Sequence, residues 1–453
     1  MNNDTICAVA TPTGGALSIV RVSGNKAITI VSEVFSKNLL QAKGNTLHYG
    51  TIGGKETIDE ILVSVFRAPH SYTGEDSVEI SCHGSSYIVQ QILHLLVAKG
   101  CRMANPGEYT QRAYLNGKLD LSQAEAVADL IASTNRATHQ IALSQLRGHF
   151  SSELSHLRDQ LLKLTSLLEL ELDFSDHEEL EFANRSELTE IAEEIDKKIK
   201  HLAHSFEIGQ ALKEGIPVAI VGKTNVGKST LLNRLLHEDR AIVSDIHGTT
   251  RDTIEDTIDL KGITFRFIDT AGIRQTTDEI EQIGIERTYA SIKKARIVIW
   301  IIDELPTPEE QQGILEATSG KSLIITQNKI DKEETEVLNI SQFPEAENYS
   351  FISISAKHNI HIDKLEEAIY KAANIPTLAD TDVVVTNTRH YEALTRASQS
   401  LSHVLDGLQI GLSGDLLAED LRDVLSILSE ITGGEITTNE VLGNIFKHFC
   451  IGK

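Results

Sequence analysis

Eight residues near the middle of the chain have the types and spacing of a phosphate-binding loop. Residues 222–229 read GKTNVGKS, which fits the pattern G-x-x-x-x-G-K-[S/T]. The glycines let the backbone wrap a phosphate chain, and the following helix adds the positive end of its dipole. Lys228 is predicted to reach the β- and γ-phosphates and Ser229 to ligate Mg²⁺. An apolar run at 216–221 and leucines at helical spacing after Ser229 supply the strand and the helix that the motif needs.

A second motif lies where another strand is predicted to end. The residues DTAG occupy 269–272 and follow the apolar run 263–268. Asp269 can hold Mg²⁺ through a water molecule, and Gly272 can offer its N–H to the γ-phosphate.

Two further motifs predict that the bound base is guanine. The residues NKID at 328–331 follow a predicted strand, and the Asp331 carboxylate can accept both N–H donors on the edge of guanine, a pattern that adenine lacks. The residues SAK at 355–357 follow the next strand and can support the base from the other side. Each motif alone could be an ordinary turn at a strand end, but four motifs in this order predict a small GTPase domain.

The segment between the phosphate loop and DTAG is predicted to be a mobile switch. Residues 244–252 read SDIHGTTRD, a polar stretch that contains glycine, and Thr250 is the predicted second Mg²⁺ ligand. Gly272 is followed by Ile273, whereas the Ras pattern has a water-positioning Gln there, so catalysis must come from elsewhere. The residues predicted to bind GTP are Asn225, Val226, Gly227, Lys228, Ser229, Thr230, Ser244, Asp245, Ile246, His247, Gly248, Thr249, Thr250, Asp269, Thr270, Ala271, Gly272, Asn328, Lys329, Asp331, Ser355, Ala356 and Lys357.

The phosphate loop resembles that of the potassium-dependent class among the translation-factor-related GTPases. In that class an Asn at the position of Asn225 ligates K⁺, and the ion can neutralise developing charge as an arginine finger would. The resemblance implies that oxygens of Ser244, Ile246 and Thr249 complete the K⁺ site. It also implies that Glu281 orients the attacking water through a bridging water. An arbitrary Glu at this place is more often a solvated acid at the start of a helix.

Composition sets the broad class of the protein. A chain of 453 residues that is 41% hydrophobic should hold two to four domains with proper cores. The absence of a long apolar run and of a charged leader predicts a soluble, cytoplasmic protein, and four cysteines without metal-ligand spacing fit a reducing compartment. A net charge of −23 argues against a large autonomous surface for nucleic acid, so an RNA substrate would need a local patch or a basic partner.

Hydrophobic patterning predicts a multidomain fold. Strand-like runs followed by a helix at 86–99 indicate an α+β domain at the N-terminus. Apolar residues every three or four positions from Leu143 to Leu168 predict one long amphipathic helix. An acidic stretch at 169–194 is read as a solvated helix face and loop. The tail returns to helix, with Gly433 and Gly434 as a break.

Neither helical segment makes a convincing core alone, so the two are predicted to pack together around an inserted Ras-like α/β GTPase domain. The predicted boundaries are 1–118 for the α+β domain, 119–211 and 376–453 for the all-α helical domain, and 212–375 for the GTPase domain.

The chain ends in the residues CIGK at 450–453. A terminal C-x-x-X resembles a prenylation box, but Gly452 and a final Lys fit that box poorly. Cys450 near a flexible end and a cation could be a reactive thiolate, and an incidental cysteine is an equal alternative.

The combination of these parts resembles the MnmE (TrmE) family of tRNA modification GTPases over the whole chain. Matching segments lie at 16–21, 72–76, 106–110 and 115–121, beside the C-terminal cysteine motif. The resemblance implies a homodimer formed through the N-terminal domain and a heterocomplex with the flavoprotein MnmG (GidA), which holds FAD. The pair would add an aminomethyl or carboxymethylaminomethyl group at C5 of the wobble uridine of certain tRNAs.

The resemblance also implies a tetrahydrofolate site for a 5-formyl or 5,10-methylene derivative, which supplies the one-carbon unit. Matched by position, Arg21, Glu79, Lys118 and Lys453 would contact the folate, with cations for its carboxylates and a carboxylate for the pterin edge. Without the resemblance each would be read as a surface charge. Cys450 becomes a candidate catalytic residue.

Two alternative functions remain open at this point. A ribosome-assembly GTPase would share the nucleotide motifs, but such proteins usually carry a basic RNA-binding module. A purely regulatory GTPase would need neither folate nor Cys450. Folate binding by residues 1–118 discriminates both from the modification enzyme, because a domain used only for dimerisation would not bind it.

Overall fold

The structure is a computed structural model that divides into two compact units. The first unit comprises Met1–Ala132, Ala142–Ala203 and Arg389–Lys453, and the second comprises Ser133–Ile141 and His204–Thr388. The structure describes residues 4–12, 14–54, 56–173, 185–238, 256–268, 281–332, 338–343, 349–376, 382–434, 442, 445–447, 449 and 452. Within these ranges, the side chains of residues 170–173, 237–238 and 281–287 are not described.

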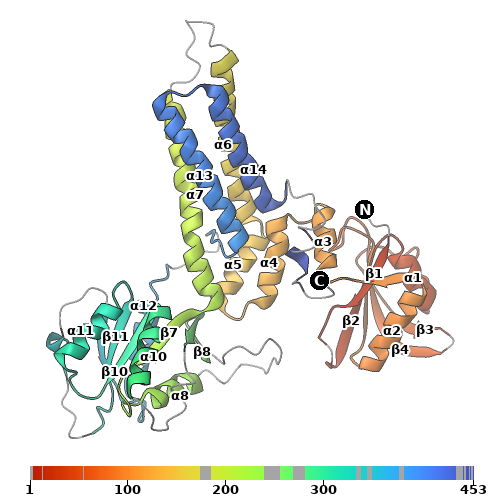
Figure 1. Cartoon of the computed structure of the whole chain (residues 1–453). Coiled ribbons are helices and arrows are strands. Elements are labelled where there is room, and N and C mark those ends of the chain that lie inside the picture. Colours follow the sequence, from red (N-terminus) through yellow and green to blue (C-terminus); the bar gives the residue numbers. More distant parts are fainter. Residues whose placement is uncertain are drawn as a thin grey trace. The chain divides into compact units, whose positions relative to one another are not determined.

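The first unit begins with a six-stranded sheet in the order β3-β4-β5-β2-β1-β6 (Figure 1). Only the β1–β6 pair is parallel. The elements are β1 (Thr5–Val9), β2 (Leu17–Ser23), α1 (Ala27–Val34), β3 (Thr46–Gly53), β4 (Thr57–Phe66), β5 (Ser77–His83), α2 (Ser86–Ala98), β6 (Cys101–Met103) and α3 (Glu108–Leu115). The α+β expectation for this region is confirmed.

Alternation along the strands sends polar and apolar residues to opposite faces. Val20 of β2 and Ile80 of β5 are cross-strand neighbours in the core that α1 and α2 cover. Arg21 and Glu79 are also directly opposite each other. Since successive side chains of a strand point to opposite faces, both lie on the face away from that core.

Long helices form the rest of the first unit. They are α4 (Leu121–Ala132), α5 (Arg136–Leu146), α6 (His149–Asp173), α7 (Arg185–Glu214), α13 (Thr388–Ile410) and α14 (Gly414–Thr432). Residues 136–141 of α5, 204–214 of α7 and 388 of α13 belong to the second unit. Figure 1 shows α6, α7, α13 and α14 running beside one another. Ser398 of α13 donates a hydrogen bond to Asp196 of α7 at 2.9 Å, and α14 packs along α6. The predicted packing of the two helical segments is therefore observed.

The prediction of one continuous helix through Leu143–Leu168 is wrong. The chain turns at Arg147 and Gly148, between α5 and α6. Gly148 has φ +84°, a left-handed conformation that is costly for residues with a Cβ and typical of helix ends.

The second unit contains a doubly wound sheet in the order β12-β11-β10-β7-β9-β8. Its strands are parallel except for β8. Apolar clusters cover both faces, as parallel sheets require. The elements are β7 (Ile216–Val221), α8 (Lys228–Glu238), β8 (Asp256–Leu260), β9 (Ile263–Phe267), α10 (Glu281–Lys294), β10 (Ile297–Ile302), α11 (Pro308–Ala317), β11 (Ser322–Gln327), a short 3-10 helix (Ile340–Gln342), β12 (Tyr349–Ser353) and α12 (Ile362–Ala372).

The fold class is confirmed, and the domain boundaries stay a prediction. Residues 133–141 group with the second unit, although the sequence predicts them in the helical domain. Within the described residues, no helix is both long and apolar enough to cross a membrane.

Candidate functional site

The phosphate loop connects β7 to α8, and its backbone requires glycine at two positions. Gly222 has φ +149° and Gly227 has φ +105°. A Cβ on Gly222 would lie 2.2 Å from the Ile301 carbonyl oxygen, and one on Gly227 would lie 2.2 Å from Asn328 Nδ2. Side chains at these positions would therefore push the loop away from the strands that support it. The exposed Asn225 also has positive φ, at 61°.

The Lys228 ammonium is held inside this loop. Its Nζ donates to the carbonyl oxygens of Gly222 at 2.7 Å and Lys223 at 2.6 Å. Burial lowers the pKa of Lys228, because the charged form loses solvation. An ammonium has three donors, and these two bonds leave one for a phosphate oxygen. Ser229 follows at the first turn of α8, half-buried, where its hydroxyl is suited to a Mg²⁺ ion that also contacts phosphates.

Asn328 joins three of the predicted motifs. It follows β11, and its side chain is buried. Nδ2 donates to the Val226 carbonyl oxygen of the phosphate loop at 2.8 Å, and Oδ1 accepts from the Ala356 N–H at 3.0 Å. The carboxyl ends of β7, β11 and β12 meet at this edge of the sheet, which is where doubly wound folds bind ligands.

The predicted base-binding residues lie on the segments that follow β11 and β12. The Ser355 hydroxyl donates to Asp331 Oδ1 at 2.6 Å, and this bond lowers the pKa of the exposed Asp331 carboxyl. His358 Nε2 lies 3.5 Å from the other Asp331 oxygen. A carboxylate fixed in this way can accept paired N–H donors from a planar base. Lys357 is exposed beside it.

Two supporting residues, Asp303 and Arg234, are absent from the sequence-based predictions. Asp303 pairs with the Lys329 ammonium at 2.7 Å, and Lys329 has φ +67°. Arg234 of α8 donates to the carbonyl oxygens of Ala356 at 3.4 Å and Lys357 at 3.2 Å. Asp303 directly follows β10, so its place at the carboxyl end of a central strand was a usable signal. The spacing of Arg234 gives no such signal.

Part of the predicted nucleotide site lies outside the described residues. This holds for the whole segment from Ser244 to Thr250, which includes three predicted K⁺ ligands and one Mg²⁺ ligand, and for Asp269 to Gly272. It also holds for the side chain of Glu281, although that residue begins α10. Within the described residues, Asn225, Ser229 and the two base-binding motifs are brought to one edge of the sheet.

A second cluster of predicted residues lies on the N-terminal sheet. Arg21 donates to Glu79 Oε1 through Nε at 3.0 Å and Nη2 at 2.8 Å. The rings of Tyr72 and Tyr109 lie 5.5 Å and 5.6 Å from the Arg21 guanidinium carbon, within cation–π range. Lys118 Nζ donates to the Pro69 carbonyl oxygen at 3.1 Å. The two tyrosines belong to the segments 72–76 and 106–110, which already carry the family resemblance.

The end of the chain reaches this cluster. Arg21 Nη1 donates to the Gly452 carbonyl oxygen at 3.1 Å, and Gly452 has φ +92°. A Cβ on Gly452 would lie 2.1 Å from the Val9 carbonyl oxygen, so the close approach requires glycine. Leu442 and Phe446, which precede Gly452 in the chain, pack on Leu121 and Ala124 of α4. Cys450 and Lys453 lie outside the described residues.

Comparisons with known proteins cover nearly the whole chain. The model described as the GTP-binding protein TrmE N-terminus matches residues 5–118, and the MnmE helical domain model matches residues 121–450. The chain is 56% identical over 467 residues to the tRNA modification GTPase MnmE of Bacteroides fragilis, with 100% of both chains covered. It is 55% identical over 469 residues to that of Bacteroides thetaiotaomicron and 51% identical over 468 residues to that of Flavobacterium johnsoniae, again with 100% of both covered. The chain therefore belongs to the MnmE (TrmE) family of tRNA modification GTPases.

Proposed function

We propose that this chain hydrolyses GTP to drive modification of the wobble uridine of certain tRNAs. The observation that carries the GTP part of the proposal is the Asn328 side chain, which bonds both the phosphate loop and the Ala356 motif. The family match supports the tRNA part. One amide thereby connects the element suited to phosphates with the elements suited to guanine. Asp331 supports the choice of guanine, because its fixed carboxylate matches the paired donors of that base.

The hydrolysis site would combine this chain's residues with two cations. Ser229 and Thr250 would ligate Mg²⁺, and Asn225, Ser244, Ile246 and Thr249 would ligate K⁺. When bound, these ions would neutralise charge that develops on the phosphates. Lys228 would hold the β- and γ-phosphates, and the Glu281 carboxylate would orient the attacking water. Hydrolysis would drive a conformational cycle in which the two GTPase domains of a dimer meet and then part.

The N-terminal sheet would bind a tetrahydrofolate that carries a one-carbon unit, as the 5-formyl or 5,10-methylene form. Glu79 would offer a carboxylate to the donor edge of the pterin with its partner Arg21 beside it, and Lys118 and Lys453 would offer cations to the folate carboxylates. The grouping of Arg21, Glu79 and the Gly452 carbonyl oxygen supports this proposal. Cys450 would lie two residues from Gly452 and is the candidate catalytic thiol.

The modification itself would require partners. A homodimer and a complex with the flavoprotein MnmG would add an aminomethyl or carboxymethylaminomethyl group at C5 of the uridine, in the cytoplasm. FAD would reside on MnmG. That protein would also supply most tRNA contacts, because the net charge of −23 here disfavours a large phosphate-binding surface.

The test is GTP turnover by the full chain in K⁺ and in Na⁺. We expect K⁺ to accelerate hydrolysis and Asn225→Ala to remove most of that acceleration while GTP still binds. Lys228→Ala should abolish turnover in both salts. Turnover that is indifferent to the exchange of K⁺ for Na⁺ would refute the role assigned to Asn225.

A further inference from the structure

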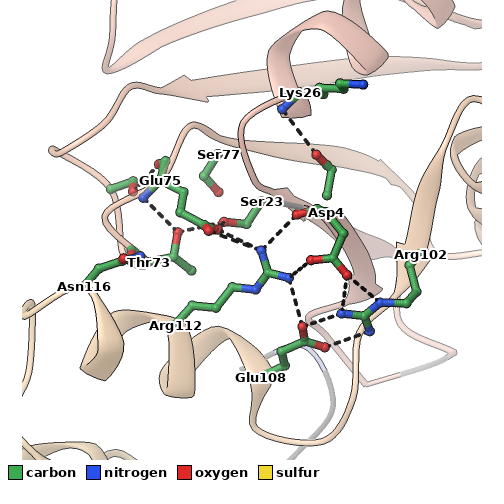
Figure 2. A network of polar contacts seen from close by, with 12 residues as sticks. Asp4, Ser23, Lys26, Thr73, Glu75, Ser77, Arg102, Glu108, Arg112 and Asn116 are labelled. Carbon is green, nitrogen blue, oxygen red and sulfur yellow. Dashed lines mark hydrogen bonds and ion pairs between the residues drawn. The ribbon is translucent and has the colours of Figure 1, made fainter. Parts of the chain in front are cut away.

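A partly buried ionic network lies beside the N-terminal sheet, and its charged residues have been given no function above (Figure 2). Arg112 of α3 lies at its centre, and its side chain is only 8% exposed. Its Nη2 donates to Asp4 Oδ1 at 2.7 Å and to Glu108 Oε1 at 2.9 Å. Its Nη1 lies 3.2 Å from both carboxylate oxygens of Glu75. One guanidinium therefore contacts three carboxylates from three segments.

Arg102 completes the network from the other side. It donates to Asp4 Oδ2 at 2.8 Å and to Glu108 Oε1 at 2.6 Å. Burial raises the pKa of Glu108, but Arg102, the Asn105 backbone N–H and Arg112 together outweigh it and hold that pKa below its usual value. Among the described residues, the hydrogen bonds of Arg102 do not reach Glu75. Both arginines thus contact Asp4 and Glu108, and of the two only Arg112 also contacts Glu75.

The third carboxylate belongs to a loop that we call the Glu75 loop, residues 69–76 between β4 and β5. Ser23 of β2 bonds Glu75 Oε2 at 2.9 Å and the Thr73 hydroxyl at 2.7 Å. Asn116, just after α3, donates to the Thr73 carbonyl oxygen at 2.7 Å. Thr73 is fully buried. Arg112 and Asn116 together clamp this loop against α3.

The same loop carries residues that surround Arg21. Tyr72 presents its ring to the Arg21 guanidinium, and its hydroxyl bonds Thr110 of α3 at 2.9 Å. Lys118 donates to the Pro69 carbonyl oxygen, and its side-chain carbons lie near the position of a Gly74 Cβ, at 3.3 Å and 3.5 Å. The position of the loop therefore fixes both Tyr72 and Lys118.

We infer that Arg112 is a positioning residue for the folate site, acting through Glu75 and the Glu75 loop. This inference rests on the proposed folate binding. The physical reason is that a buried guanidinium paired with several carboxylates is hard to replace: removal of one partner leaves uncompensated charge and releases the segments that it joined. Arg112 acts on the ligand only by holding Tyr72 and Lys118 beside Arg21.

The test compares Arg112→Lys with Arg102→Lys in the full chain. Both changes keep one positive charge in the same network, but a lysine at 112 cannot bridge three carboxylates. Two quantities are measured: the exchange rates of the Gly74 and Glu75 amide hydrogens without ligand, and the affinity for 5-formyltetrahydrofolate. We expect Arg112→Lys to raise both exchange rates and to weaken folate binding by about 10-fold or more. Arg102→Lys should leave the exchange rates and the folate affinity within about 3-fold of the wild-type values. This difference between the two variants should persist when their thermal unfolding midpoints are equal.

Equal effects of the two substitutions, or unchanged exchange in Arg112→Lys, would overturn the inference. If Arg112→Lys does not fold, Asn116→Ala takes its place, because it loosens the Glu75 loop without breaking an ion pair. Unchanged amide exchange in Asn116→Ala would equally contradict the claim that these contacts hold the Glu75 loop against α3. A wild-type chain that binds no folate would refute the proposed folate site together with this role. That outcome is separate, because the exchange rates are measured without ligand.

Discussion

Single residues decide how the nucleotide site is assembled. The types and spacing of Lys228, Asp331 and Ser355 could be predicted from the sequence, since each belongs to a short motif. The hydrogen bond from Asn328 to the phosphate loop could not be predicted. It depends on a buried side-chain amide just after β11 that bonds a residue 102 positions earlier in the chain. Sequence spacing holds no information about that distance until the sheet order is known.

Asp331→Asn should change the base that the site accepts. A carboxylate accepts both donors of guanine, whereas an amide presents one donor and one acceptor, which suits xanthine. We expect GTP affinity to fall by about 10- to 100-fold and xanthosine triphosphate affinity to rise. Titration of both nucleotides measures this, with Asp363→Asn in the first turn of α12 as control. Wild-type GTP affinity in Asp331→Asn would contradict the assignment.

Glu125 of α4 should make the first unit sensitive to acid. Its carboxylate lies 2.7 Å from His390 Nε2 and 2.8 Å from Arg389 Nη2. Burial raises its pKa, but the two partners outweigh that effect and lower the pKa from 4.5 to about 2. A carboxyl whose pKa is lower in the folded chain stabilises the fold at every pH above the pKa of the unfolded chain. Here this contribution is about 3 kcal/mol, and it is lost as pH falls from about 4.5 towards 2.

Denaturant unfolding of the wild type and of Glu125→Gln tests this behaviour. At pH 7 the variant should unfold at lower denaturant, because Arg389 and His390 lose their carboxylate partner. The difference between the two chains should shrink as pH falls below about 4.5. A difference that stays constant from pH 7 to pH 3 would contradict the role given to this carboxyl.

At the scale of elements, periodic segments could be predicted and polar ones could not. Helix α2 and strands β7 and β9 follow apolar patterns, and their predicted bounds of 86–99, 216–221 and 263–268 agree with the observed ones to within a residue. Helix α3 is only eight residues long, and its buried residues mix Glu108, Thr110 and Arg112 with Tyr109 and Ala113, so no apolar periodicity predicts it. The break at Gly148 was missed because Leu146 and Phe150 keep helical spacing across it.

Gly148→Ala should destabilise the turn between α5 and α6. The residue has φ +84°, and an added Cβ would lie 3.2 Å from Gln123 Nε2. We expect the free energy of unfolding of the first unit to fall by about 1 kcal/mol, seen as a lower thermal midpoint. Gly54→Ala is the matched control, since Gly54 lies in open space without positive φ. An unchanged midpoint in Gly148→Ala would show that the turn tolerates a side chain.

At the scale of the whole molecule, charge limits what this chain does alone. With a net charge of −23, it should bind tRNA weakly without a partner, with dissociation constants above about 1 μM. Addition of MnmG should tighten binding, and the gain should fall as salt rises, because the added contacts are to phosphates. Fluorescence anisotropy of labelled tRNA measures both. Tight tRNA binding by this chain alone would contradict the proposal that MnmG supplies most of the tRNA contacts.

Family membership could be inferred from the sequence. The contact between residues near the two ends of the chain could not be predicted from hydrophobic patterning. Arg21 and the Gly452 carbonyl oxygen are separated by 431 residues and lie 3.1 Å apart. No periodicity predicts such a contact. Only the resemblance, which assigns both Arg21 and Lys453 to one ligand, pointed to it.

The most direct test is the nucleoside content of tRNA from cells that lack this chain, measured by mass spectrometry at the wobble uridine. Reintroduced wild-type and Lys228→Ala chains complete the comparison. We predict that the C5-aminomethyl family of modifications is lost without the chain, returns with the wild type, and stays absent with Lys228→Ala. Unchanged wobble uridines in cells without the chain would contradict the account.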